Sequence, residues 1–253
     1  MSRRGLRRLA DPRGWCRVLG IELSPVSHRE RLLSLLGGVL SVPALYLISR
    51  LYVEADALVP VVASMGASAV LLFAVPHGTL SQPWPLLGGH IVSALVGVTC
   101  ADWLGTTMPA AALAVGVAIG TMHYLRCLHP PGGATALVAV IGGPAVTSLG
   151  YGYVVTPVAV NALVMFAVAL AFNAPFAWRR YPAWLFERTR PPVAEPPGAI
   201  RHEDFVYALS QLDTFVDVSE DDLLQIYALA TGRHPHGEVS TLCRSHGSSA
   251  CSA

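Results

Sequence analysis

The stretch HYLRCLHPPGGATALVAVIGG, His123 to Gly143, places two prolines and two glycines at the head of an apolar run. Proline is tolerated in the first turn of a helix, because the N–H groups there have no partner within the helix, but it is damaging in a helix interior. Pro130 and Pro131 therefore predict that a helix begins at this point.

The composition of the chain is that of a membrane protein. Of its 253 residues, 53% are hydrophobic and only 13% are charged, and the mean hydropathy is positive. A net charge of +1 gives no indication of a nucleic-acid partner. The five cysteines are an odd number without a short regular spacing, which argues against a disulfide framework.

Six apolar stretches approach the roughly 20 residues that a helix needs to cross the hydrocarbon core. They are residues 32–49, 57–75, 86–104, 108–125, 130–149 and 153–172. Arginines precede the first stretch and follow the fourth and the sixth, so six crossings keep them on one side, as the positive-inside rule requires. We predict an all-α protein of about six transmembrane helices in a bacterial inner membrane, with both termini cytoplasmic. A fifth stretch that re-entered the membrane would reduce the count to five.

The regions around this membrane domain differ from it in composition. We divide the chain into a basic cytoplasmic arm (1–31), the transmembrane domain (32–178), a proline-rich linker (179–201), a short amphipathic helix pair (202–230) and a tail (231–253). From Arg190 the linker is proline-rich and is expected to be extended and exposed, and the tail has the composition of disordered segments.

The first turn after the prolines has features that suit an anion. Gly132 and Gly133 carry no side chain, Ala134 is small and Thr135 offers a hydroxyl, so a ligand can approach the backbone closely. Free N–H groups and the helix dipole at such a turn contribute about 0.3–2 kcal/mol to anion binding. The plainer interpretation is a loop and a helix start at the membrane interface.

A second stretch resembles this turn. GASAVLLFAV, which begins at Gly66, is similar to GATALVAVI from Gly133, and Ser68 then corresponds to Thr135. The third and sixth apolar stretches are separated by the same number of residues as Gly66 and Gly133. This spacing predicts a 3+3 inverted repeat with interrupted helices, an arrangement that recurs in transporters. Gly66, Ala67 and Ser68 therefore join the predicted binding residues. Alternatively, these small residues only allow helices to pack closely.

Four more polar residues lie in or beside apolar stretches, where such side chains usually face a cavity or a partner. Gln82 is predicted to line an inner mouth. His90 either carries a proton or binds a backbone carbonyl, and Asn161 either bridges two helices or contacts the substrate. Arg126 either anchors the chain at the inner surface or attracts anions.

Metal and enzyme chemistry have little support in the sequence. The histidines and cysteines after residue 233 match no zinc spacing, and His123, Cys127 and His129 lack a third group that would complete a catalytic set. There is no phosphate-binding loop or dinucleotide fingerprint. We predict no cofactor, no metal and no enzymatic activity.

The segments LHPPGGATAL, GASAVLLF and SQPWPLLGGH together resemble the HPP family of integral membrane proteins over roughly residues 30–180, with His129, Pro130 and Pro131 as the family motif. The resemblance implies a small polytopic membrane protein, and some plant plastid members are nitrite transporters. The predicted function is thus a transporter or channel for a small inorganic anion, nitrite or nitrate, and its expected partners are the lipid bilayer and further copies of the chain. The alternative is a non-transporting membrane module whose cytoplasmic helices dock a regulatory partner.

Overall fold

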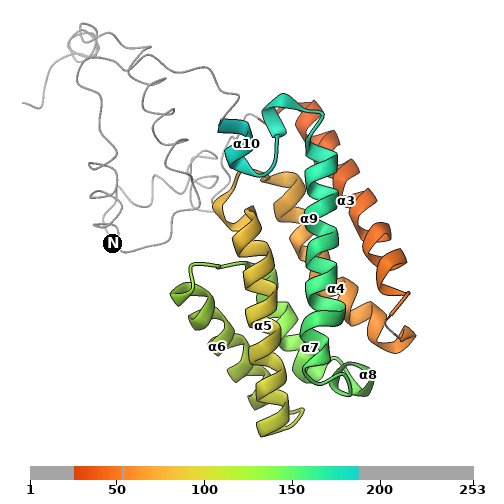
Figure 1. Ribbon diagram of the computed structural model, residues 1–253, viewed down its shortest axis with the longest axis vertical. Helices are drawn as coiled ribbons and strands as arrows, with labels where there is room; N and C mark the ends of the chain where they lie inside the picture. Colours follow the sequence, from red (N-terminus) through yellow and green to blue (C-terminus); the bar gives the residue numbers. More distant parts are fainter. Residues whose placement is uncertain (1–25, 53, 188–253) are drawn as a thin grey trace, which may run out of the picture.

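The computed structural model describes residues 26–52 and 54–187, and this part of the chain is helical throughout, without a strand. Figure 1 shows the arrangement of the main helices. They are α3 (His28–Ser49), α4 (Ala55–Ala74), α5 (Pro83–Leu104), α6 (Met108–Tyr124), α7 (Pro130–Ile141) and α9 (Val160–Asn173). Short elements connect or follow them: η1 (Thr79–Ser81), α8 (Pro144–Thr147), η2 (Val154–Ala159), η3 (Ala177–Arg179) and α10 (Ala183–Glu187).

Helix ends follow from residues that favour caps and starts. Ser27 accepts a hydrogen bond from the Glu30 N–H at the start of α3, and Thr107 does the same for the Ala110 N–H at the start of α6. Proline occupies the first turn of α5, α6 and α7. Helix α5 ends at Leu104, and the next residue, Gly105, has a φ of 73°, which suits glycine.

The helices differ in whether they are long enough to cross a membrane. Four apolar stretches meet that length: α3, α4, α5, and η2 together with α9 (Val154–Asn173). Helix α6 has 17 residues and α7 only 12, and 12 residues extend about 18 Å against a hydrocarbon core of about 30 Å. All six predicted stretches contain helix, but six crossings are not confirmed. The fifth stretch, 130–149, is not one continuous helix, because α7 ends at Ile141 and Gly143 adopts a φ of 95° before α8.

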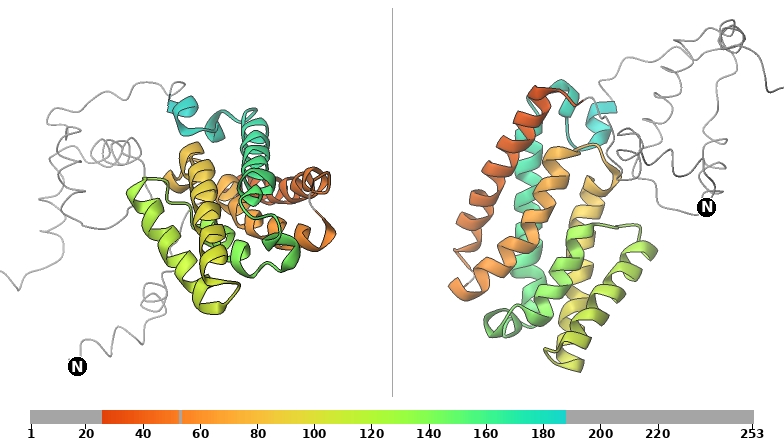
Figure 2. Two further views of the ribbon diagram at one scale, coloured as in Figure 1. Left: turned by 60° about the horizontal axis from the view of Figure 1, so that its bottom comes forward. Right: turned by 180° about the vertical axis from the view of Figure 1, so that it is seen from behind.

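The bundle has α3 and α6 at opposite edges (Figures 1 and 2). Helices α3 and α9 are antiparallel, because Ser49 at the end of α3 contacts Asn161 near the start of α9, whereas Glu30 at the start of α3 contacts Arg179 beyond the end of α9. Many large apolar side chains of α3 and α6 point outward, whereas the polar Ser41 and Ser49 of α3 are buried. A bundle surrounded by lipid has no need to hide apolar side chains.

Helices α5 and α7 run in the same direction and touch through small residues. A Cβ added at Gly89 would lie 2.5 Å from the Cβ of His129, and one added at Gly97 would lie 2.6 Å from the Ala136 carbonyl oxygen. A Cβ added at Gly132 would lie 2.9 Å from the Gly89 carbonyl oxygen. The absence of side chains at these positions therefore sets how closely the two helices approach.

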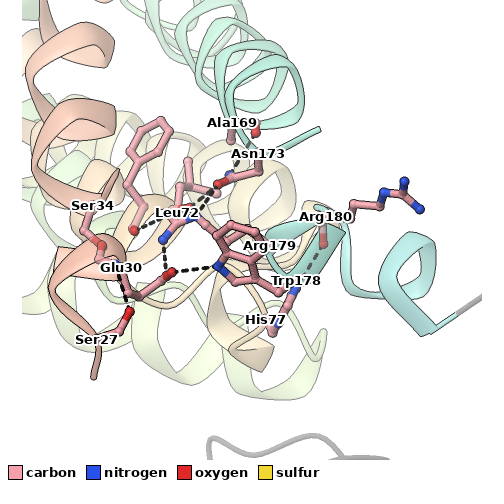
Figure 3. A network of polar contacts seen from close by, with 11 residues as sticks. Ser27, Glu30, Ser34, Leu72, His77, Ala169, Asn173, Trp178, Arg179 and Arg180 are labelled. Atoms are coloured by element: carbon pink, nitrogen blue, oxygen red, sulfur yellow. Dashed lines mark hydrogen bonds and ion pairs between the residues drawn. The ribbon is translucent and has the colours of Figure 1, made fainter. Parts of the chain in front are cut away.

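Beyond α9, the chain folds back onto the bundle and not away from it. The buried Arg179 side chain reaches Glu30 of α3, the Phe73 carbonyl of α4 and Asn173 of α9 (Figure 3). Tyr181 is also buried and donates to the Ser81 carbonyl oxygen at 2.8 Å. Residues 179–187, at the start of the segment assigned to the linker, therefore pack against the bundle, whereas the proline-rich part from Arg190 lies outside the described residues. The remainder of the linker, the helix pair 202–230, the tail 231–253 and most of the basic arm lie outside the described residues.

Candidate functional site

The His-Pro-Pro motif stands where α7 begins inside the bundle. His129 is the N-cap of α7 with an extended backbone, and Pro130 is the first helical residue. The preceding turn is tight, because Arg126 has a φ of 54° and the Cys127 N–H returns to the Met122 carbonyl at 2.9 Å. The predicted helix start at Pro130 is confirmed, and the turn before it directs the His129 side chain into the protein.

His129 and His90 are joined through the hydroxyl of Ser68. The Ser68 Oγ atom lies 2.8 Å from Nε2 of His90 and 2.9 Å from Nε2 of His129. The two imidazole rings are 4.9 Å apart between centroids and meet edge to face. Ser68 comes from α4, His90 from α5 and His129 from the start of α7, so one hydroxyl connects three elements.

The second nitrogen of each ring, Nδ1, also has a hydrogen-bond partner. Nδ1 of His90 lies 2.7 Å from Oγ1 of Thr135, and Nδ1 of His129 lies 2.9 Å from the Leu80 carbonyl oxygen. The side chains of Ser68, His90, His129 and Thr135 are fully buried. We call these four residues the histidine cluster. Two ionisable rings buried without water contact in a membrane protein are costly, and such residues usually serve a function.

Tyr153 closes this region from the segment that precedes η2. Its hydroxyl donates to the Thr135 backbone carbonyl at 3.2 Å, and the side chain is buried. Sequence reasoning missed Tyr153, since a tyrosine at the head of an apolar stretch is usual at a membrane interface. The Leu80 carbonyl was missed as well, because no side-chain pattern indicates a backbone acceptor.

The backbone at the start of α7 offers less to an anion than expected. Pro130 and Pro131 have no N–H, and the Gly132 N–H already donates to the His129 carbonyl at 2.8 Å. Residues further along bond within the helix. The prediction of free N–H donors at this turn is therefore wrong, and only the helix dipole and side chains remain to attract a ligand.

The predicted turn at Gly66 is also wrong. Gly66, Ala67 and Ser68 lie in the interior of α4, where the backbone is bonded along the helix. The space next to Gly66 is open, Ala67 is exposed, and only Ser68 points into the histidine cluster. Ser68 and Thr135, which the repeat paired, nevertheless bind opposite nitrogens of the same ring, His90.

The other predicted residues lie elsewhere. Gln82 is the N-cap residue of α5, and its side chain binds the Gly78 carbonyl and the Ala183 N–H, so it holds loops together. Asn161 accepts hydrogen bonds from Ser49 and Tyr52 at 2.9 Å each and bridges α9 to the end of α3; its Nδ2 atom has no partner. Arg126 and Pro130 are exposed, Gly133 and Ala134 are half-buried, and Pro131 and Gly132 are buried.

Comparison with known proteins decides the family. Residues 23–182 match the family described as the HPP transmembrane region, which is more than half of the chain. The chain belongs to the HPP family. The matched residues include all six main helices and the histidine cluster.

Two relatives of this HPP protein come from Dictyostelium discoideum and are described only as transmembrane proteins. One is 43% identical over 125 residues, which cover 48% of this chain and 40% of the relative. The other is 39% identical over 127 residues, which cover 49% of this chain and 44% of the relative. The HPP chain thus matches less than half the length of each relative. No solved structure matches it.

Proposed function

We propose that this HPP protein is a membrane conduit for a small inorganic anion, with nitrite or nitrate as the substrate. The observation that carries the proposal is the histidine cluster, four polar side chains buried at the start of a helix too short to span. Polar groups at such a place in a membrane protein favour a solute pathway over simple packing.

The chemistry of the buried groups favours an anion over a cation. Within the described residues, the buried polar side chains are hydroxyl, imidazole, amide and guanidinium groups, and none is a carboxylate. Hydroxyl and imidazole groups can donate hydrogen bonds to an anion that displaces one of their present acceptors. The α7 dipole also presents its positive end beside His129.

Binding at this site is expected to be weak. Arg179, the one buried arginine in the described part of the chain, is already paired with Glu30 at the end of the bundle, so it supplies no fixed positive charge to the histidine cluster. Weak binding suits a conduit, because an ion that binds too tightly does not leave. Nitrite and nitrate are small enough to be coordinated by a few side-chain donors.

Uptake of nitrite and nitrate into proteoliposomes tests the proposal. Thr135→Val and Ser68→Ala each remove one hydroxyl of the histidine cluster, and each is expected to cost about 0.5–1.5 kcal/mol of ion binding, or roughly two- to twelve-fold in affinity. The affinity is measured as the concentration that gives half-maximal uptake.

Matched controls lie on the same or a neighbouring helix. Ser64 is buried one turn before Ser68 and donates to the Val61 carbonyl at 2.8 Å, and Thr121 of α6 donates to the Val117 carbonyl at 2.8 Å. Ser64→Ala and Thr121→Val are expected to leave uptake unchanged. If well-folded wild-type protein takes up neither ion, the proposal is wrong and the non-transporting module is favoured.

A further inference from the structure

The hydrogen-bond partners in the histidine cluster determine which nitrogen of each ring carries a hydrogen. The Leu80 carbonyl can only accept, so Nδ1 of His129, 2.9 Å away, carries a hydrogen. In the neutral ring, Nε2 of His129 then accepts, and its partner at 2.9 Å, the Ser68 hydroxyl, must donate. The tautomer of His129 is thus assigned from its hydrogen bonds.

The same reasoning assigns the ring of His90. Ser68 has one hydrogen, which it gives to His129, so it accepts from Nε2–H of His90 at 2.8 Å. Nδ1 of His90 then has a lone pair and accepts from the Thr135 hydroxyl at 2.7 Å. The hydrogen bonds run in a single direction, from Thr135 through His90 and Ser68 to His129 and Leu80.

This arrangement has one place where a proton can be added with little movement. The Thr135 hydroxyl lies 3.5 Å from the Pro131 carbonyl as well as 2.7 Å from His90. When it turns to that carbonyl, its oxygen faces His90 with a lone pair. An added proton then bonds to Nδ1 of His90, and the new N–H donates a hydrogen bond to Oγ1 of Thr135. The hydrogen bond between Thr135 and His90 is thereby reversed, while those from His90 through Ser68 to His129 and Leu80 keep their direction.

The resulting imidazolium would have no fixed countercharge. Among the described residues, no acidic side chain is buried. The His90 ring meets the ring of His129 edge to face, and Tyr153 bonds the backbone carbonyl of its partner Thr135. The buried polar residues of α9 are the uncharged Asn161 and Asn173. The acids of α4 and α5, Asp56 and Asp102, are exposed, as is His123 of α6. The bound anion is then the natural partner of the added charge.

We infer that the protein carries one proton together with each anion, with the His90–Ser68–His129 hydrogen-bond chain as the proton site. This inference rests on the proposed anion transport and specifies how that transport is driven. A proton and a monovalent anion moving together transfer no net charge. Uptake is therefore driven by a pH difference and is insensitive to membrane potential, whereas an open anion pathway without proton linkage responds to the potential.

Proteoliposomes with an entrapped pH dye and a potential fixed by potassium and valinomycin test the inference, with nitrate as the probe. Nitrate is chosen because its conjugate acid is strong and does not leak across lipid as a neutral molecule. An inward nitrate gradient should acidify the lumen, and an external pH one unit lower should accumulate nitrate about tenfold, which is the limit for one-to-one coupling.

Variants separate the proton site from a structural role. Thr135→Ser keeps the hydroxyl and should keep proton uptake, whereas His90→Gln removes the basic nitrogen and should abolish the response to pH. In wild-type protein, ¹⁵N NMR should show His90 with its hydrogen on Nε2 and His129 with its hydrogen on Nδ1. Because this measurement uses wild-type protein, it does not depend on whether a variant folds.

The outcomes distinguish the two proposals. Nitrate uptake that follows the membrane potential and brings no protons overturns proton coupling and leaves anion transport in place. Absence of both nitrite and nitrate uptake overturns anion transport itself. Two histidines with the same tautomer overturn the directional hydrogen-bond chain.

Discussion

Arg179 shows how a single charge is accommodated at the end of the bundle. Its guanidinium is 1% exposed, and it donates to Asn173 at 3.1 Å and to the Phe73 carbonyl at 2.7 Å while pairing with Glu30. Burial lowers the pKa of this guanidinium, and the Glu30 carboxylate opposes that shift. The side chain therefore ties the chain after α9 to α3 and α4, so the two ends of the described region are held together.

Replacement of Arg179 by glutamine is expected to destabilise the protein by about 1–3 kcal/mol, because the ion pair is lost and buried acceptors are left unpaired. The expected decrease in the free energy of unfolding is smaller than for a fully buried ion pair, because the Glu30 side chain is 22% exposed and can be hydrated. Thermal unfolding in detergent measures the change. Arg180→Gln is the control, because the Arg180 side chain points away from the network in Figure 3. Equal effects of the two substitutions would show that the network is not a stabilising contact.

At this scale, sequence reasoning found candidate residues but not their partners. Ser68, His90 and Thr135 were selected by separate arguments, yet the bonds that join the cluster connect residues 22, 45 and 61 positions apart. Such pairs depend on the register of packed helices, which no local pattern specifies. Gln82 was misinterpreted for the same reason, since its partner Ala183 lies 101 positions away.

At the scale of elements, proline explains why the helix start predicted at Pro130 is confirmed and the turn predicted at Gly66 is wrong. Pro130 and Pro131 force α7 to begin, and the sequence shows this directly. The corresponding positions before Gly66 are Ala63 and Ser64, which continue a helix without difficulty, so α4 is uninterrupted there. Similar small-residue sequences thus adopt a helix start in one case and a helix interior in the other.

The two glycines of the motif have different roles in the packing of α7. A Cβ at Gly132 would lie 2.7 Å from the Ser93 hydroxyl oxygen and 2.9 Å from the Gly89 carbonyl oxygen, whereas a Cβ at Gly133 would meet only the Val115 side chain, at 3.8 Å. Gly132→Ala is expected to destabilise the protein by about 1–3 kcal/mol through overpacking.

Gly133→Ala is the matched control, one residue further along the same turn. It is expected to be neutral or to stabilise the helix by up to about 1 kcal/mol, because alanine favours helix over glycine. Unfolding in detergent compares the two variants. Similar stability of both would mean that α5 and α7 do not approach as closely as described.

At the scale of the whole molecule, whether the two ends of the described region lie on the same side of the membrane does not depend on how α6 and α7 are counted. These two helices are joined by the short turn at Arg126, and they either cross the membrane as a pair or enter and leave on the same side. The pair therefore adds two crossings or none to the four long helical stretches. Both counts are even, so we predict that the two ends of the described region, at residues 26 and 187, face the same side of the membrane. The arginines before α3 and after α9 predict that this side is cytoplasmic.

Single cysteines at residues 5 and 195, in a protein without its native cysteines, test this topology. Both are expected to react with a membrane-impermeant thiol reagent only after the cells are permeabilised. Arg126→Cys is expected to behave in the same way, because an exposed arginine is stable at the cytoplasmic interface and costly within lipid. No labelling at residue 126 from either side would indicate a re-entrant α6–α7 pair. Labelling of residue 5 or residue 195, but not both, in intact cells would contradict the even count, and with it the arrangement in which α3 and α9 lie antiparallel in one bilayer.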